Sequence, residues 1–407
     1  MKVLLIHPPH PNSTDDRLDP PMGLLYIASH LRKNGINVEV LDLSGQHYSD
    51  AENMPFADVY GITSYIATLD ITEQIAMICK KTNPKAKVVI GGAHASVRPQ
   101  DFRYADNVIQ GYGEGPMLAL CGNTTAKVDL FEFPAFDLVD LSTYSRIIDD
   151  KPSLPFLTSR GCPFKCSFCG LAMMHNINGR YHMMNPAVAA TQLYRIKYEY
   201  GIDRLNFQDD IFTMNRPRLF EILNHVRNLN MRFRCMGRAG YDTEETYEKL
   251  AEAGCGQIAW GIESGSQYML DRMRKQVTVQ DNYDVIRWAK KYGIVSRAFF
   301  IIGFPGETKE TLEETKRFIE QANPDQYFVS SFVPYPGTEV ADHSDWYGIT
   351  NMSYDYRQYF QVSKDGTGGL TIDTEWLSKE QFRELELEFR AWIKARGIRG
   401  AKQNYES

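Results

Sequence analysis

Short apolar runs and amphipathic helical patterns alternate along most of the chain, and this alternation constrains the fold more than any other feature. Residues 1–7 are a continuous apolar run, and residues 20–35 carry apolar side chains at helical spacing. Further strand-like runs follow at 37–43, 57–64, 87–96 and 107–115, with a second helical pattern at 71–84. Continuous apolar runs are typical of parallel strands covered on both faces. Residues 1–120 therefore predict a doubly wound α/β domain, although the 44–56 connection is short for a helical crossover.

The alternation resumes at residue 154 and continues to residue 340. Six strands are expected, at 155–160, 204–209, 232–239, 257–264, 296–305 and 326–334. A TIM barrel has eight strand–helix units, so six predict an open, partial (β/α)6 TIM-like barrel. Residues 121–153 have no clear period and are expected to connect the two domains. Residues 341–407 predict an aromatic loop and a C-terminal helix, with Ser378 and Gln381 as its capping box.

Composition and charge narrow the class of protein. The net charge of −6 argues against a general affinity for nucleic acid or an anionic membrane. No apolar run is long enough to span a bilayer. The apolar N-terminus has no small-residue cleavage site after it, so we interpret it as a buried strand. Seven cysteines form an odd set without a disulfide pattern, which predicts a cytoplasmic protein.

Three of these cysteines lie in the segment RGCPFKCSFCG, residues 160–170, where Cys162, Cys166 and Cys169 have the spacing C-x3-C-x2-C. Glycine and proline around them indicate a loop. The loop follows the first expected barrel strand, and barrel enzymes place their catalytic groups at the carboxyl ends of strands. Three thiolates can hold a 4Fe-4S cluster with one iron open to a non-protein ligand. The alternative is a structural zinc site, in which Cys235 or Cys255 would supply the fourth ligand.

The C-x3-C-x2-C spacing, with Phe168 before the last cysteine, resembles the radical S-adenosylmethionine (SAM) superfamily. The resemblance implies that Cys162, Cys166 and Cys169 bind a 4Fe-4S cluster whose open iron is chelated by SAM. It further implies that an electron from the cluster cleaves SAM and releases a 5′-deoxyadenosyl radical. The expected substrate is a small molecule or a small natural-product intermediate, and the expected protein partner is an electron donor such as flavodoxin or ferredoxin.

Later segments resemble the superfamily strand by strand. In NFQDDIFTMN (206–215), the resemblance implies that Asp209 or Asp210 receives the SAM ammonium, with Asp210 also counted as catalytic; the alternative is a cap for the helix near Arg216. In IAWGIESGS (258–266), Glu263 is expected to bind ribose hydroxyls, and a helix-entry charge is the alternative. The full set of expected cofactor contacts in the barrel is Phe168, Asp209, Asp210, Arg238, Gly261, Glu263, Ser264, Arg297 and Gly303.

The positions of Arg238, Arg297 and Gly303 suggest which part of SAM each would contact. Arg238 and Arg297 lie at or near strand ends, where a guanidinium could clamp the SAM carboxylate. Each could equally be a structural ion-pair partner. Gly303 begins the turn GFPGET, which in the superfamily borders the adenine.

Residues 1–120 resemble the cobalamin-binding domain that precedes many such barrels, through LLIHPP, PPMGLLYIASHLRKNG, VIGGAHAS and GYGEGP. The resemblance implies cobalamin beyond the carboxyl ends of the strands, where small residues permit close approach. The expected contacts are Gly91, Gly92, Gly111 and Gly113. The D-x-H-x-x-G motif is absent, and His7 and His10 lack its spacing, so no histidine of the first βα loop is expected to bind cobalt. We interpret His94 as a hydrogen-bonded turn residue.

Together these patterns predict a cytoplasmic radical SAM enzyme that uses cobalamin to methylate an unactivated carbon of a small molecule. One alternative is a radical SAM enzyme with a vestigial cobalamin domain that performs dehydration, rearrangement or ring chemistry. A second is a non-catalytic iron–sulfur or zinc protein that senses redox state. The aromatic residues in 346–360 would either form a lid over a planar substrate or cover a hydrophobic face. No nucleic acid or membrane partner is expected.

Overall fold

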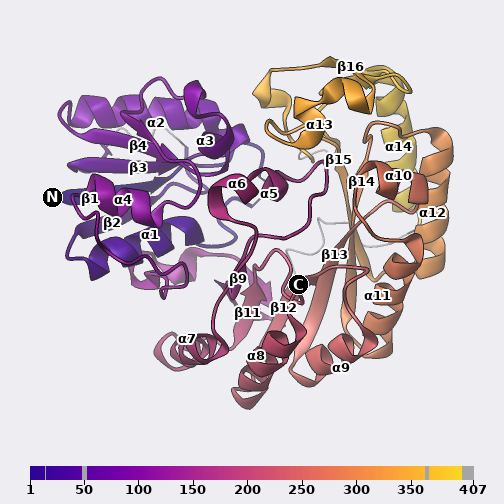
Figure 1. Ribbon diagram of the computed structural model, residues 1–407, viewed down its shortest axis with the longest axis horizontal. Coiled ribbons are helices and arrows are strands. Elements are labelled where there is room, and N and C mark those ends of the chain that lie inside the picture. Colours follow the sequence, from indigo (N-terminus) through magenta and orange to yellow (C-terminus); the bar gives the residue numbers. More distant parts are fainter. Residues whose placement is uncertain (14, 48–52, 363–365, 397–407) are drawn as a thin grey trace. The chain divides into compact units, whose positions relative to one another are not determined.

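The computed structural model describes residues 1–13, 15–47, 53–362 and 366–396. The chain divides into two compact units (Figure 1). The first comprises Met1–Ser145 and Met174–Gly179, and the second comprises Arg146–Met173 and Arg180–Ser407. The segment 174–179 therefore belongs to the first unit although it follows the cysteine loop in sequence.

The first unit is built on a parallel five-stranded sheet with the order β2-β1-β3-β4-β5. Its strands are β1 (Lys2–His7), β2 (Asn37–Asp42), β3 (Val59–Thr63), β4 (Lys87–Gly91) and β5 (Asn107–Val108). This is a flavodoxin-like order, in which the chain reverses direction across the sheet between β1 and β3. The doubly wound fold predicted from the sequence is confirmed.

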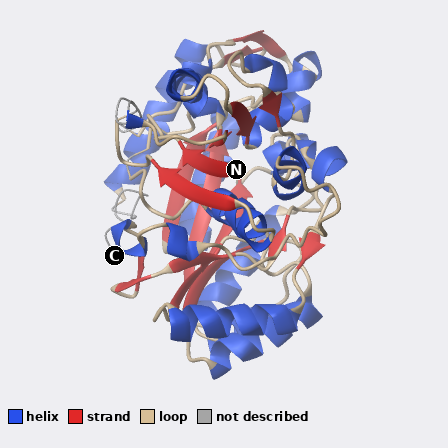
Figure 2. Cartoon of the chain, turned by 90° about the vertical axis from the view of Figure 1, so that its left-hand side faces the viewer, coloured by secondary structure: helices blue, strands red, loops and turns tan. Residues whose placement is uncertain are grey.

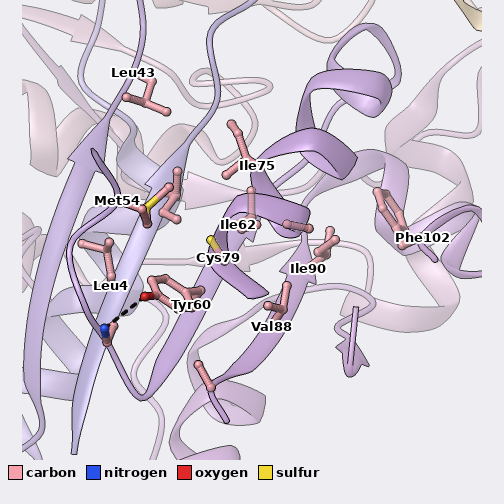
Figure 3. Packing of buried hydrophobic residues seen from close by; sticks show 14 of the residues in the cluster. Leu4, Leu43, Met54, Tyr60, Ile62, Ile75, Cys79, Val88, Ile90 and Phe102 are labelled. Carbon is pink, nitrogen blue, oxygen red and sulfur yellow. Dashed lines mark hydrogen bonds between the residues drawn. The ribbon is translucent and has the colours of Figure 1, made fainter. Parts of the chain in front are cut away.

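Helices cover both faces of this sheet, which explains why β1 is apolar at every interior position. Val3 and Leu5 pack into one hydrophobic cluster, together with residues of α1 (Met22–Lys33) and α4 (Glu114–Leu120). Leu4 and Ile6 pack into the opposite cluster, with residues of α2 (Leu69–Thr82) (Figure 3). Successive strand residues point to opposite faces, so two covered faces require a continuous apolar run.

The first unit differs from the sequence prediction in three places. Residues 93–96, predicted as part of a strand, belong to α3 (Ala93–Val97), and β5 is only two residues long. The unit extends through Ser145, because Ala135 joins the core and donates its backbone N–H to Leu25. Residues 48–52 of the short connection lie outside the described residues. The remaining short elements are η2 (Ile66–Thr68), η3 (Pro99–Asp101), η4 (Phe136–Leu138), η5 (Leu141–Thr143) and α6 (His175–Asn178).

The second unit is built on a parallel six-stranded sheet with the order β15-β14-β13-β12-β11-β8. Its strands are β8 (Leu154–Phe156), β11 (Arg204–Phe207), β12 (Arg232–Gly237), β13 (Cys255–Glu263), β14 (Val295–Ile302) and β15 (Gln326–Ser331). The first and last strands are the two edges of the sheet, so the predicted open barrel is confirmed. The first strand is shorter than predicted, because residues 159–160 form β9 (Ser159–Arg160), which pairs antiparallel with β10 (His182–Met183).

Helices follow the strands and lie along the outer side of the curved sheet (Figures 1 and 2). They are α7 (Pro186–Glu199), α8 (Arg216–Asn228), α9 (Glu244–Glu252), α10 (Gln267–Arg272), α11 (Val279–Lys291) and α12 (Lys309–Ala322). The helix α14 (Lys379–Ala395) begins at the predicted Ser378–Gln381 capping box. Other short elements are β6 (Ile147–Ile148), β7 (Lys151–Pro152), α5 (Gly170–Met173), α13 (Glu339–Asp342), η6 (Ser344–Tyr347), β16 (Ile349–Met352), η7 (Tyr356–Gln358) and β17 (Ile372–Thr374).

The aromatic segment 346–360 covers a hydrophobic face. Tyr347 and Ile349 join a buried cluster with Phe304 and Phe332, which lie just after β14 and β15. Trp346 remains 66% exposed. This packing favours the covering role over a lid that stacks on substrate. Within the described residues, no helix is both long and apolar enough to cross a membrane.

Candidate active site

The cysteine loop is held at its centre by two backbone hydrogen bonds. Ser167 donates its N–H to the carbonyl of Met273 (3.0 Å) and accepts from the N–H of Val340 (3.1 Å). At the start of the loop, Gly161 has a φ of +86°, and a side chain there would lie 2.6 Å from the carbonyl oxygen of Arg180. Glycine is therefore required where the loop leaves β9.

The three predicted cluster ligands lie near one another on this loop. Cys166 is buried, while Cys162 and Cys169 are half-buried. Burial raises the pKa of the Cys162 thiol, and it raises the pKa of Cys169 to about 11; the charge of Cys166 adds to both shifts. In the described part of the chain, no three Cys, His, Asp or Glu side chains converge on a point that would hold a single ion. A cubane, in contrast, takes each thiolate on a different iron, and three neighbouring cysteines suit it.

The cysteines proposed to complete a zinc site lie elsewhere in the sheet. Cys235 of β12 and Cys255 of β13 are buried, and their Sγ atoms contact each other at 4.0 Å. The Cys255 thiol also donates to the carbonyl of Gln257 at 3.3 Å. Both behave as core thiols, so the structure gives no support to the zinc alternative.

The two aspartates after β11 have different surroundings. Asp209 is fully buried, and its carboxylate accepts hydrogen bonds from the backbone N–H of Thr158 (3.0 Å) and from the hydroxyls of Thr158 and Ser159 (2.6 Å each). It thereby fixes the chain between β8 and β9. Asp210 is half-buried, and its Oδ2 accepts from Gly161 N–H at 2.9 Å. Neither residue caps α8, whose cap is Asn215, so that alternative was wrong.

Burial raises the pKa of Asp210 to about 6, against the opposing effect of the Gly161 hydrogen bond. An approaching cation would favour the ionised form. Asp210 thus keeps a carboxylate beside the cysteine loop, whereas the hydrogen bonds of Asp209 are already made within the protein. The geometry distinguishes the two candidates, which the sequence could not.

Glu263 lies at the carboxyl end of β13 and forms a buried ion pair that the sequence did not predict. Its Oε1 accepts from Lys275 Nζ at 2.7 Å, and the two side chains are 9% and 8% exposed. Glu263 has a left-handed backbone with φ +65°. A side chain at Gly261 would lie 2.1 Å from Glu263 Oε1 and 2.9 Å from Lys275 Nζ, so Gly261 makes room for this pair. Glu263 precedes the Ser266 cap of α10 and is not a helix-entry charge.

Arg238 follows β12 and is only 6% exposed. Its guanidinium lies over the ring of Phe164, at 3.7 Å from the centroid. Nη1 is 3.8 Å from Cys166 Sγ, and Nη2 donates to the carbonyl of Lys275. Arg238 therefore joins the cysteine loop to the segment that carries Lys275.

Four other predicted contacts are engaged within the protein or lie away from this end of the sheet. The Ser264 hydroxyl is 3.1 Å from Thr315 Oγ1 and also accepts from Ser266 N–H. Phe168 packs edge-on against Phe304, and a side chain at Gly303 would meet the Phe382 ring. Arg297 is the third residue of β14, so the carboxyl end of that strand lies roughly 16 Å further on at about 3.3 Å per residue. Its placement gives no support to the predicted carboxylate clamp.

The predicted glycines of the first unit lie at the carboxyl ends of β4 and β5. A side chain at Gly92 would lie 2.6 Å from the carbonyl oxygen of Ser64. A side chain at Gly111 would collide with Asn178, and one at Gly113 would collide with Ile27. Gly91 is less crowded, with Ile109 Cβ at 3.8 Å. Gly92, Gly111 and Gly113 therefore permit close packing within the unit.

The topological switch point lies between β1 and β3, and open sheets of this kind bind ligands there. His7 ends β1 and lies edge-on to Tyr65, which follows β3. Burial lowers the pKa of His7, and its Nδ1 has no hydrogen-bond partner within the described residues. An orphaned polar atom at this position suits a bound ligand. His94 interacts instead with Asp101 at 3.0 Å, as a turn histidine does.

The family model described as the Radical SAM superfamily matches residues 156–319, which include the cysteine loop, Asp210, Arg238 and Glu263. Residues 156–319 belong to the radical SAM superfamily. A second model, the B12 binding domain, matches residues 19–121. The cofactors of this combination are a 4Fe-4S cluster, SAM and cobalamin.

Curated relatives match most of the chain. An uncharacterised methyltransferase of Pyrococcus horikoshii is 29% identical, and the match covers 89% of this chain and 87% of the relative. The anaerobic magnesium-protoporphyrin IX monomethyl ester cyclase of Rubrivivax gelatinosus is 25% identical over 84% of this chain and 69% of the relative.

A solved structure matches the whole architecture. The radical SAM methyltransferase TsrM of Kitasatospora setae, with cobalamin and a 4Fe-4S cluster bound, superposes with a TM-score of 0.72. The match covers 96% of this chain and 88% of TsrM at 17% identity. This likeness confirms the fold.

Proposed function

We propose that this enzyme methylates an unactivated carbon of a small molecule in a cobalamin-dependent radical SAM reaction. The observation that carries the proposal is the presence in one chain of the three-cysteine loop and a B12-binding domain. When bound, the cluster and SAM supply the 5′-deoxyadenosyl radical, and cobalamin carries the methyl group. The protein contributes binding, orientation and electrostatics.

The residues of the second unit have distinct roles in this proposal. Cys162, Cys166 and Cys169 hold the cluster. Asp210 receives the SAM ammonium, because Oδ2 is anchored on Gly161 N–H while Oδ1 makes no hydrogen bond within the described residues. Glu263 accepts from the ribose hydroxyls, and Lys275 holds its carboxylate in place.

The relatives support methyl transfer and also define a second candidate. The Pyrococcus relative is named as a methyltransferase, and TsrM has also been seen with tryptophan as substrate. The Rubrivivax relative is a cyclase, which favours ring formation as the second candidate. Both reactions begin with a 5′-deoxyadenosyl radical, so that product does not separate them.

The test is anaerobic reconstitution with iron, sulfide and hydroxocobalamin, followed by incubation with SAM and reductant. Methyl transfer predicts both 5′-deoxyadenosine and S-adenosylhomocysteine as products. Formation of 5′-deoxyadenosine alone, with cobalamin supplied, would reject the methyltransferase and favour the cyclase class.

We further propose that an acidic redox protein such as flavodoxin or ferredoxin delivers the electron. Residues 151–198, which contain the cysteine loop, have six Lys and Arg residues and no Asp or Glu, although the whole chain is acidic. Lys165 on the loop is exposed, as is Arg180, whose carbonyl lies against Gly161. Exposed charges of one sign steer an oppositely charged partner, and salt screens this attraction.

A further inference from the structure

Arg238 is a buried cation whose guanidinium has no carboxylate partner among the described residues. Its guanidinium contacts Cys166 Sγ, the Lys275 carbonyl and the Phe164 ring, and in the described part of the chain it forms no ion pair with a carboxylate. A buried charge is costly unless a compensating group neutralises it. A cluster thiolate at Cys166 would be that group.

Several contacts fix the direction of this side chain. Phe164, two residues before Cys166, covers one face of the guanidinium, and the Lys275 carbonyl occupies Nη2. Nη1 is thereby aimed at Cys166 Sγ, at 3.8 Å.

We propose that Arg238 is a positioning residue for Cys166 and raises the reduction potential of the cluster. Reduction adds one electron, and hence one negative charge, to a cluster held by three thiolates. A fixed cation and an N–H···S hydrogen bond both stabilise the reduced form more than the oxidised form. This role replaces the SAM carboxylate clamp predicted for Arg238, and it is independent of the substrate and of methyl transfer.

The test is a redox titration of the reconstituted, full-length protein, monitored by electron paramagnetic resonance without SAM, cobalamin or substrate. R238Q is expected to shift the redox equilibrium at least about tenfold toward the oxidised cluster. For a one-electron couple, this shift makes the reduction potential about 59 mV more negative. R238K keeps the positive charge but loses the stacking of the planar guanidinium on Phe164. Its reduction potential is expected to lie between those of R238Q and the wild type.

R234Q is the matched control. Arg234 lies within β12, the strand that Arg238 follows, and donates to Asn206 Oδ1 at 2.9 Å, so the substitution removes the same charge away from the cysteine loop. Its potential should equal that of the wild type. An equal shift in R234Q would mean that net charge alone acts, and it would overturn the proposal.

Two further outcomes would also overturn the proposal. One is an unchanged potential in R238Q with full iron and sulfide content, especially if SAM binding is lost, because Arg238 would then serve the carboxylate. The other is failure of both R238Q and R238K to hold a cluster while circular dichroism stays native, because the role would then be assembly only.

Discussion

The Glu263–Lys275 ion pair gives the sharpest quantitative prediction. Glu263→Ala removes the carboxylate that accepts from Lys275 Nζ at 2.7 Å and leaves a lysine whose side chain is 8% exposed. Removing one partner of a buried pair costs about 3–5 kcal/mol, because the remaining charge stays desolvated. Replacing both partners with apolar residues is often close to neutral. E263A should therefore lower the free energy of unfolding by about 3–5 kcal/mol, and E263A/K275M should recover most of that loss.

Urea unfolding of the cluster-free protein can measure both values by tryptophan fluorescence. The five tryptophans are Trp260, Trp288, Trp346, Trp376 and Trp392, so the signal reports the second unit, which contains all of them. A loss below about 1 kcal/mol in E263A would refute the reasoning, as would a double variant less stable than E263A. In the loaded protein, the proposed ribose contact predicts a further loss of SAM affinity of about 10- to 150-fold in both variants, from about 1.5–3 kcal/mol for a hydrogen bond to a charged group.

Three other predictions follow from the described contacts. D209A should destabilise the protein by at least about 3 kcal/mol, because it leaves buried donors of residues 158–159 unpaired. D210N should leave the stability in urea nearly unchanged but weaken SAM binding measured by calorimetry. Burial raises the pKa of Glu307 from 4.5 to about 7. Between these two pH values the folded state therefore holds a proton that the unfolded state has released. Stability from this group therefore falls by about 3 kcal/mol as pH rises from about 4.5 to 7, and E307Q should lack that slope in urea midpoints measured across this range. Charge reversal in K165E/R180E should slow cluster reduction by an acidic flavodoxin about tenfold at low salt in stopped-flow absorbance, and the difference should vanish at high salt. An unaltered rate would remove this surface from donor docking.

Features fixed by local pattern were predictable from the sequence. The continuous apolar run of β1 predicted a strand covered on both faces, and Val3 and Leu4 now lie in opposite clusters. The cysteine spacing predicted a loop after the first barrel strand. The Ser378–Gln381 box predicted the start of α14. In each case the physical cause acts over a few residues, so it is legible without the fold.

Features that depend on contacts between distant residues were not predictable. Nothing in the segment MRKQ marks Lys275 as buried, because its burial depends on the Glu263 carboxylate across the end of the sheet. The sequence places Arg238 and Arg297 at or near strand ends, but only the fold places Arg238 beside Cys166 and Arg297 near the amino end of β14. The sequence also did not reveal that a side chain at Gly92 or Gly261 would meet neighbouring protein atoms.

The most direct test of cobalamin-dependent methyl transfer needs no substrate. The reconstituted protein is loaded with cobalamin, reduced to the cob(I)alamin state under anaerobic conditions and mixed with SAM carrying a labelled methyl group. The predicted result is labelled methylcobalamin with an equal amount of S-adenosylhomocysteine. Failure to bind cobalamin, or 5′-deoxyadenosine formation without methylcobalamin at any cobalamin concentration, would contradict the account.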